Sequence, residues 1–124
     1  MPPTNLSPAS QDRHARQYMD YLRLLHLVEK ATPELQLDAS SERLLHWMAI
    51  SWQAGSKITV VQAMHKATDM STTTAHRRLK LMRQQGFIAL ETDAIDQRIK
   101  YVVPAEKSHR LFAQNGHCVT TAQG

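Results

Sequence analysis

Cysteine, aromatic residues and long apolar runs are scarce in this 124-residue sequence. Its single cysteine, Cys118, excludes an internal disulfide framework. No run of about 18 apolar residues occurs, so we expect no membrane span. The start, MPPTNLSPAS, has neither the basic nor the apolar segment of a secretory signal, and we expect a single-domain cytoplasmic protein. With two Phe, two Trp and three Tyr, aliphatic residues and Met must form most of the core.

Motifs for catalysis and for metal binding are missing as well. The sequence has no nucleophile–base pattern and no phosphate-binding loop, so we expect neither an enzyme nor a cofactor. Seven histidines and one cysteine raise a metal sensor as an alternative. However, no two histidines are four residues apart, and His117 and Cys118 are adjacent in a polar segment. Neither pattern is typical of a zinc site, so we expect no metal.

Acidic residues are unevenly distributed along the chain, whose net charge is +4. From Met1 to Ser56, five Lys/Arg stand against six Asp/Glu, whereas from Lys57 onward ten Lys/Arg stand against five Asp/Glu. The stretch STTTAHRRLKLMRQQG, which runs from Ser71 to Gly86, contains no acid. A clustered basic surface is typical of a protein that binds a polyanion.

The first helix is predicted over residues 10–31, with Pro33 beyond its end. Residues 1–9 carry three prolines, and we expect them to be disordered. Along the helix, one apolar face follows the 3.6-residue repeat and is widened by Leu24 and Leu27. Such a face is wider than a lone surface helix needs, which indicates a dimerisation element formed by Tyr18, Tyr21, Leu22, Leu25 and Val28. The alternative is that this helix folds back onto its own domain.

A helix-turn-helix is predicted in the middle of the chain. A helix over about 39–54 follows the cap candidate Asp38 and carries a buried stripe. The next helix opens on the capping box Thr59-x-x-Gln62 and is short. A turn over residues 68–70 then leads to a longer basic helix, which Ser71 caps and Gly86 stops.

The pattern changes to strands after this helix. Residues 87–92 and 98–103 alternate as strands do, and the polar link over 93–97 predicts a hairpin. Pro104 ends the second strand and suits the first turn of a last helix over about 105–114, followed by a flexible tail over 116–124. The fold class is therefore mainly α with a small β-hairpin wing: a winged helix-turn-helix over residues 37–115, with an added N-terminal helix and a linker that ends at residue 36.

The threonines at the start of the basic helix indicate a role other than helix stability. Because Ala75, Leu79 and Met82 share one face, we expect them to pack inward and the threonine tip and the cations to face out. Threonine is a mediocre helix former, but it is short, and its hydroxyl and methyl can both contact base edges in the major groove. The alternative is a solvated first turn that has no role in recognition.

Residues 37–112 contain the motifs Leu37-Asp38, the Thr59 cap, Met70-Ser71-Thr-Thr-Thr74, Leu79-x-x-Met82-x-x-x-Gly86-Phe-Ile88 and Asp96-Gln-Arg98. With these motifs, the segment resembles the winged-helix domain of MarR-type bacterial transcription regulators. The resemblance implies that Arg98 reaches the minor groove with Asp96 as its support, and that the start of the basic helix enters the major groove. After the last predicted helix the chain is short and polar, where the family has a long dimerisation helix.

We therefore expect a sequence-specific regulator that binds double-stranded DNA as a homodimer, with a small-molecule effector as a further candidate partner. The alternative is a winged-helix module that binds protein and has an incidental basic face. The predicted DNA-binding residues are Ser71, Thr72, Thr73, Thr74, His76, Arg77, Lys80, Arg83, Asp96, Arg98 and Lys100.

Overall fold

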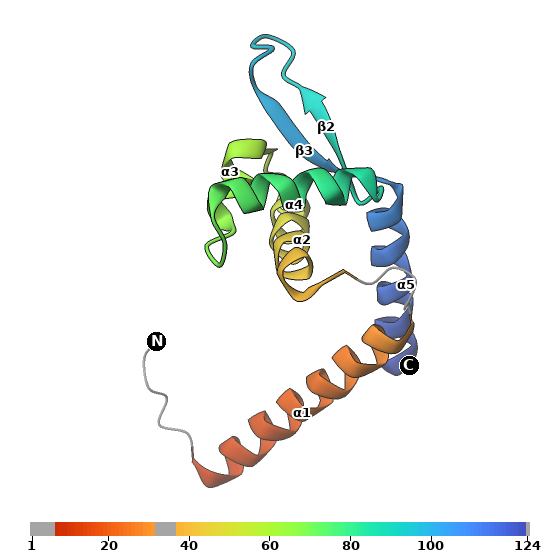
Figure 1. Cartoon of the computed structure of the whole chain (residues 1–124). Helices are drawn as coiled ribbons and strands as arrows, with labels where there is room; N and C mark the ends of the chain where they lie inside the picture. Colours follow the sequence, from red (N-terminus) through yellow and green to blue (C-terminus); the bar gives the residue numbers. More distant parts are fainter. Residues whose placement is uncertain (1–6, 32–36, 124) are drawn as a thin grey trace. The chain divides into compact units, whose positions relative to one another are not determined.

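The computed structural model describes residues 7–31 and 37–123, with five helices and three strands in these segments (Figure 1). By compactness the chain divides into two units. One is Leu35–Phe112, and the other combines Met1–Glu34 with Ala113–Gly124. Within the described segments, none of the helices has the length and apolar character needed to cross a bilayer.

Three helices of the first unit form the predicted helix-turn-helix and the helix before it: α2 (Ala39–Gln53), α3 (Val60–Lys66) and α4 (Thr72–Gln84). Each begins at a side chain that accepts a hydrogen bond from a first-turn amide. Asp38 caps α2, Thr59 forms a complete capping box with Gln62 on α3, and Ser71 caps α4. Three predicted helix starts are thus confirmed.

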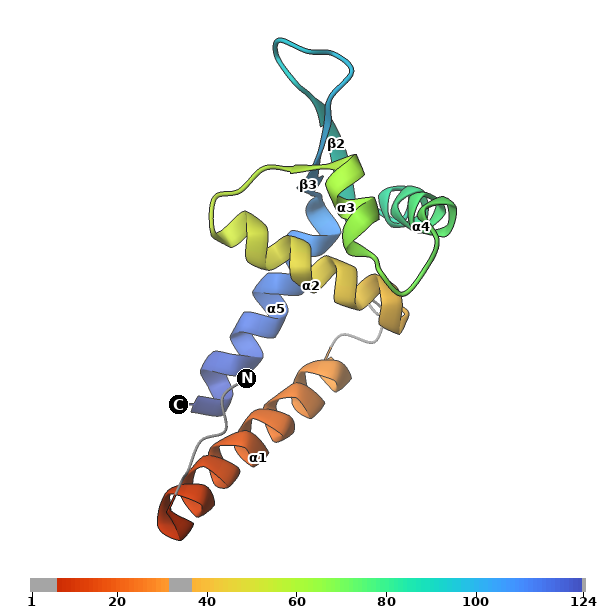
Figure 2. The same cartoon turned by 90° about the vertical axis from the view of Figure 1, so that its left-hand side faces the viewer.

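The wing is a hairpin of β2 (Ile88–Thr92) and β3 (Lys100–Pro104), as predicted. A third strand, β1 (Ile58–Thr59), pairs antiparallel with β3 and gives the sheet order β1-β3-β2. This strand was not predicted, because two residues are too few to show an alternating pattern. Pro104 ends β3 opposite Ile88, as predicted, but it does not enter the last helix, which begins at Glu106. Figures 1 and 2 show the hairpin projecting beyond α2, α3 and α4, with α4 running across α2.

One hydrophobic core joins these helices to the sheet. The α4 residues predicted to face inward are all buried, and Trp52 of α2 is half-buried, with its Nε1 donating to the Val102 carbonyl at 3.0 Å. Ser108 is fully buried and donates to the Phe87 carbonyl at 2.6 Å, which fixes the last helix against the start of the wing. The core comprises Leu44, Leu45, Met48, Ile58, Ala63, Ala67, Ala75, Leu79, Met82, Phe87, Ile88 and Val102.

Both terminal helices are longer than predicted. Helix α1 spans Pro8–Ala31, and Ser7 Oγ accepts from the Ser10 amide at 3.2 Å. Proline is favoured at a first helical position, so Pro8 begins the helix instead of excluding it. Helix α5 spans Glu106–Gln123, so the prediction of a flexible tail from residue 116 was wrong as far as 123. Residues 1–6, residue 124 and the predicted linker over 32–36 lie outside the described residues.

Candidate nucleic-acid interface

Hydrogen bonds in the first turn of α4 divide the residues of the threonine tip, Ser71 to Thr74, into two pairs. Ser71 Oγ accepts from the Thr74 amide at 3.1 Å and donates to Thr74 Oγ1 at 2.9 Å. These two hydroxyls are therefore used in capping the helix. Thr72 and Thr73 lie between them, both exposed, and no hydrogen bond within the described residues uses their hydroxyls. The tip thus presents two short side chains whose donors and acceptors are available.

The outer face of α4 carries the predicted cations Arg77, Lys80 and Arg83, together with His76. None of these four side chains forms an ion pair with an acid in the described segments. All four are exposed. Arg78 differs, since its side chain is 28% exposed and its Nη1 donates to Asp38. The structure thus gives Arg78 an ionic partner that the sequence does not reveal.

A groove of about 210 Å³ lies beside this face, where α4 meets the sheet. Lys80 and Arg83 are among its polar side chains, and its apolar lining includes Leu90 of β2. The cations of α4 therefore adjoin the strands that continue into the wing. The full lining is Val60, His76, Leu79, Lys80, Arg83, Ile88, Leu90 and Val102.

The wing turn holds Arg98 and Asp96 together, as the resemblance implied. Arg98 Nε donates to Asp96 Oδ1 at 3.0 Å and Nη2 donates to Oδ2 at 3.1 Å, so the pair is bidentate. The hydrogen bonds from Arg98 lower the pKa of the Asp96 carboxyl below its usual value. The Arg98 side chain remains 90% exposed, so the pair orients the guanidinium while leaving it accessible.

Asp93 organises the same turn, although it was not among the predicted residues. Its Oδ2 accepts from the amides of Ile95 at 3.0 Å and Asp96 at 2.8 Å, and its Oδ1 accepts from Tyr101 Oη at 2.8 Å. The bond from the Asp96 amide, followed by that from Tyr101, lowers the pKa of Asp93. An aspartate at the start of a short polar link is a known turn former, and this signal could have identified it.

Two lysines flank the hairpin. Lys100 is exposed, as predicted, and its Nζ donates to Thr92 Oγ1 at 2.7 Å across the strands. Lys57, which was not predicted to bind DNA, lies just before β1, and its Nζ is 5.1 Å from the centre of the Tyr101 ring. The sheet thereby carries Lys100 at the turn end of the hairpin and Lys57 beside Tyr101, in addition to Arg98 in the turn.

The predicted dimerisation residues lie on α1. Tyr18, Tyr21, Leu22 and Leu25 are 56%, 54%, 38% and 37% exposed, and Val28 is half-buried. The rings of Tyr18 and Tyr21 have centroids 6.3 Å apart, so they form one surface along the helix.

In the described part of the chain, no cluster of three His, Cys, Asp or Glu residues could hold a metal ion.

Several solved structures resemble this chain. A crystal structure of the S. aureus MepR–DNA complex aligns with a TM-score of 0.63 at 14% identity, covering 86% of this chain and 76% of that one. The transcriptional regulator Tm0710 from Thermotoga maritima gives 0.66 at 10% identity, with 86% and 72% covered. The fold is a winged helix, as in these MarR-family structures.

A heme sensor protein, PefR from Streptococcus agalactiae, also has this MarR-type fold. Its structure in complex with heme aligns with a TM-score of 0.55 at 19% identity, covering 93% of this chain and 75% of that one. No protein-family model matches the sequence, and no curated protein does. The predicted fold class is confirmed, and the MarR-type resemblance holds for the architecture.

Proposed function

We propose that this protein is a sequence-specific transcription regulator that binds double-stranded DNA and has no enzymatic activity. The observation that carries the proposal is the outer face of α4, where exposed cations without ionic partners in the described segments stand behind two threonines with available hydroxyls. Cations that have no partner in the protein can neutralise phosphates, and short polar side chains at a helix start can approach base edges.

In this proposal, residues 71–85 enter the major groove and the wing over 88–103 lies at the minor groove. Arg98, which is paired with Asp96 but remains exposed, supports the placement of the wing, because narrow minor grooves attract arginine. The similarity to MepR, which was solved as a complex with DNA, supports DNA as the ligand. We further propose a cytoplasmic homodimer, and the heme complex of PefR keeps a small-molecule effector among the candidate partners.

The test is selection of bound sequences from a random duplex library, followed by affinity measurements across salt concentrations. We expect an enriched, near-palindromic sequence and a log–log salt slope set by several phosphate contacts. The rival, a winged-helix module that binds protein, predicts that no sequence is enriched and that duplex affinity is negligible at physiological salt.

A further inference from the structure

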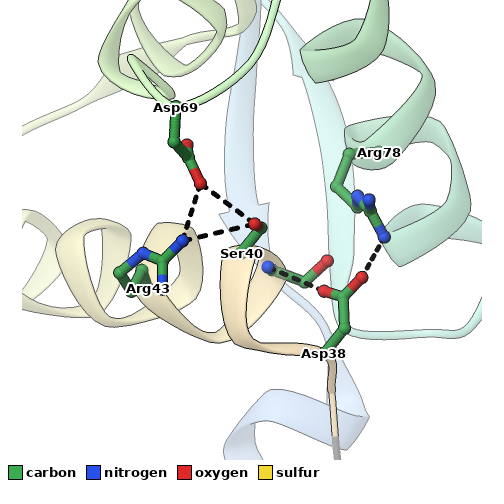
Figure 3. Close-up of polar contacts among 6 residues, drawn as sticks. Asp38, Ser40, Arg43, Asp69 and Arg78 are labelled. Carbon is green, nitrogen blue, oxygen red and sulfur yellow. Dashed lines mark hydrogen bonds and ion pairs between the residues drawn. The ribbon is translucent and has the colours of Figure 1, made fainter.

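The first turn of α2 is attached to the helix-turn-helix by two sets of charged hydrogen bonds (Figure 3). In the first, Asp38 uses both carboxylate oxygens: Oδ1 accepts from the Ser41 amide at 2.9 Å, and Oδ2 accepts from Arg78 Nη1 on α4. In the second, Asp69 Oδ2 accepts from Arg43 Nη2 at 2.7 Å and from Ser40 Oγ at 3.0 Å. The start of α2 is therefore bonded both to the loop that joins α3 to α4 and to α4 itself.

The two attachments bracket the tip that we assign to the major groove. Asp69 lies two residues before Ser71, the cap of α4, and Arg78 lies four residues after Thr74, the last residue of the threonine tip. Figure 3 shows Asp69 and Arg78 approaching the start of α2 from different elements. A segment held at both ends against one rigid helix has a defined tilt, and tilt decides which base edges a side chain can reach.

Apolar packing alone does not supply this constraint. The inner face of α4 consists of Ala75, Leu79 and Met82, and hydrophobic burial is not directional. Charged hydrogen bonds depend on distance and angle, so they can select one orientation among several that bury the same area. The pair of Arg43 and Asp69 is also partly exposed, at 63% and 42%, so it contributes little to stability.

We propose that Asp38 and Asp69 are positioning residues that hold the tip of α4 in the orientation that reads bases. This inference rests on the proposed DNA-binding function and adds residues that do not touch DNA themselves. It predicts a change in DNA affinity opposite to the one that loss of an acid ordinarily causes. Removing an acid from a DNA-binding domain ordinarily strengthens binding, because the repulsion of phosphates falls. Here, loss of either acid weakens binding to the selected site while binding to random duplex stays equal or rises.

The test compares affinities for the selected site and for random duplex, and the measured quantity is their ratio. For Asp69→Asn and Asp38→Asn we expect the ratio to fall about tenfold, which corresponds to about 1.4 kcal/mol. Asparagine at 38 retains an acceptor for the Ser41 amide, so the cap of α2 survives. Glu42→Gln is the matched control, because Glu42 is an exposed acid in the same turn and forms no ion pair within the described residues. Its ratio should equal that of the wild type.

Reversal of one pair separates positioning from charge. Asp69→Arg alone should lower the ratio, and Asp69→Arg combined with Arg43→Asp should restore most of it, since the ion pair reforms with the net charge of the wild type. This double variant keeps the test valid if Asp38→Asn fails to fold. Ratios that stay at the wild-type value in the single variants, or a double variant as poor as Asp69→Arg, would overturn the positioning role while DNA binding stands. A wild-type protein without sequence preference would overturn both proposals.

Discussion

Asp93 is the residue on which the shape of the wing turn depends most directly. Hydrogen bonds from the Asp96 amide, from Tyr101 and from the Ile95 amide lower its pKa below the ordinary 3.8, because they favour the charged carboxylate. A lowered folded-state pKa stabilises the protein above the ordinary value, and this contribution is lost as the pH falls through the folded-state pKa. Asp93→Asn should therefore lower the melting temperature near pH 7, and the difference from the wild type should vanish at strongly acidic pH.

Melting curves from neutral to strongly acidic pH would check this expectation. The control is Glu91→Gln, since Glu91 is an exposed acid on β2 that forms no ion pair in the described part of the chain. Its melting temperature should follow that of the wild type at every pH. A melting difference for Asp93→Asn that stayed constant below pH 3.8 would show that the carboxylate charge is not involved.

Arg98 allows a second prediction at the same scale. Because its side chain is 90% exposed, Arg98→Ala should leave the melting temperature nearly unchanged. It should weaken DNA binding and reduce the slope of log affinity against log salt by about one unit. The matched control is Arg110→Ala, which removes an exposed cation of α5 that pairs with Glu106 and should alter neither quantity. Equal affinities and slopes for wild type and Arg98→Ala would remove the wing from the interface.

Helix α4 is the element that carries specificity in this proposal. Thr73 and Arg77 are exposed on it, and neither has a side-chain partner in the described segments. If each reads a base, Thr73→Ala and Arg77→Ala should reduce discrimination between the selected site and single-base variants by about 1–3 kcal/mol. Thr74→Ala is an informative comparison, because the Thr74 hydroxyl bonds Ser71 and should affect stability more than discrimination. A uniform loss across all sequences would instead assign the residue to phosphate contact.

Elements with local signals could be predicted from the sequence, whereas contacts between distant segments could not. The caps at Asp38, Thr59 and Ser71 depend on residues within one turn, and the hairpin depends on a short alternating pattern. Strand β1 and the contact of Asp38 with Arg78 depend on chain segments brought together only by folding. Helix α5 was underestimated because Gly116 and polar residues obscured a helical spacing of half-buried residues at Phe112, Asn115 and Val119.

The whole molecule is proposed to act as a dimer, and the exposed apolar row on α1 is the reason. Tyr18, Tyr21, Leu22 and Leu25 are each more than one-third exposed, which in a monomer is a liability for aggregation. The short, polar C-terminus expected from the sequence would also have favoured α1 as the dimer element, but α5 removes that support by continuing to Gln123. The exposed row itself remains, and pairing two copies about a twofold axis would bury it and present two recognition helices to a near-palindromic site.

Leu22→Glu combined with Leu25→Glu should therefore give a folded monomer, because buried like charges would oppose pairing while the core of the other unit is untouched. Its affinity for the full site should fall about 100-fold or more, since the second half-site no longer binds as part of the same particle. Arg16→Gln combined with Arg23→Gln is the control, as it lowers the net charge by the same amount at exposed positions on the opposite side of α1. Light scattering at micromolar concentration gives the masses directly. A wild-type monomer that binds the full site at full strength would exclude the dimer, because no second copy would then be needed to occupy both half-sites.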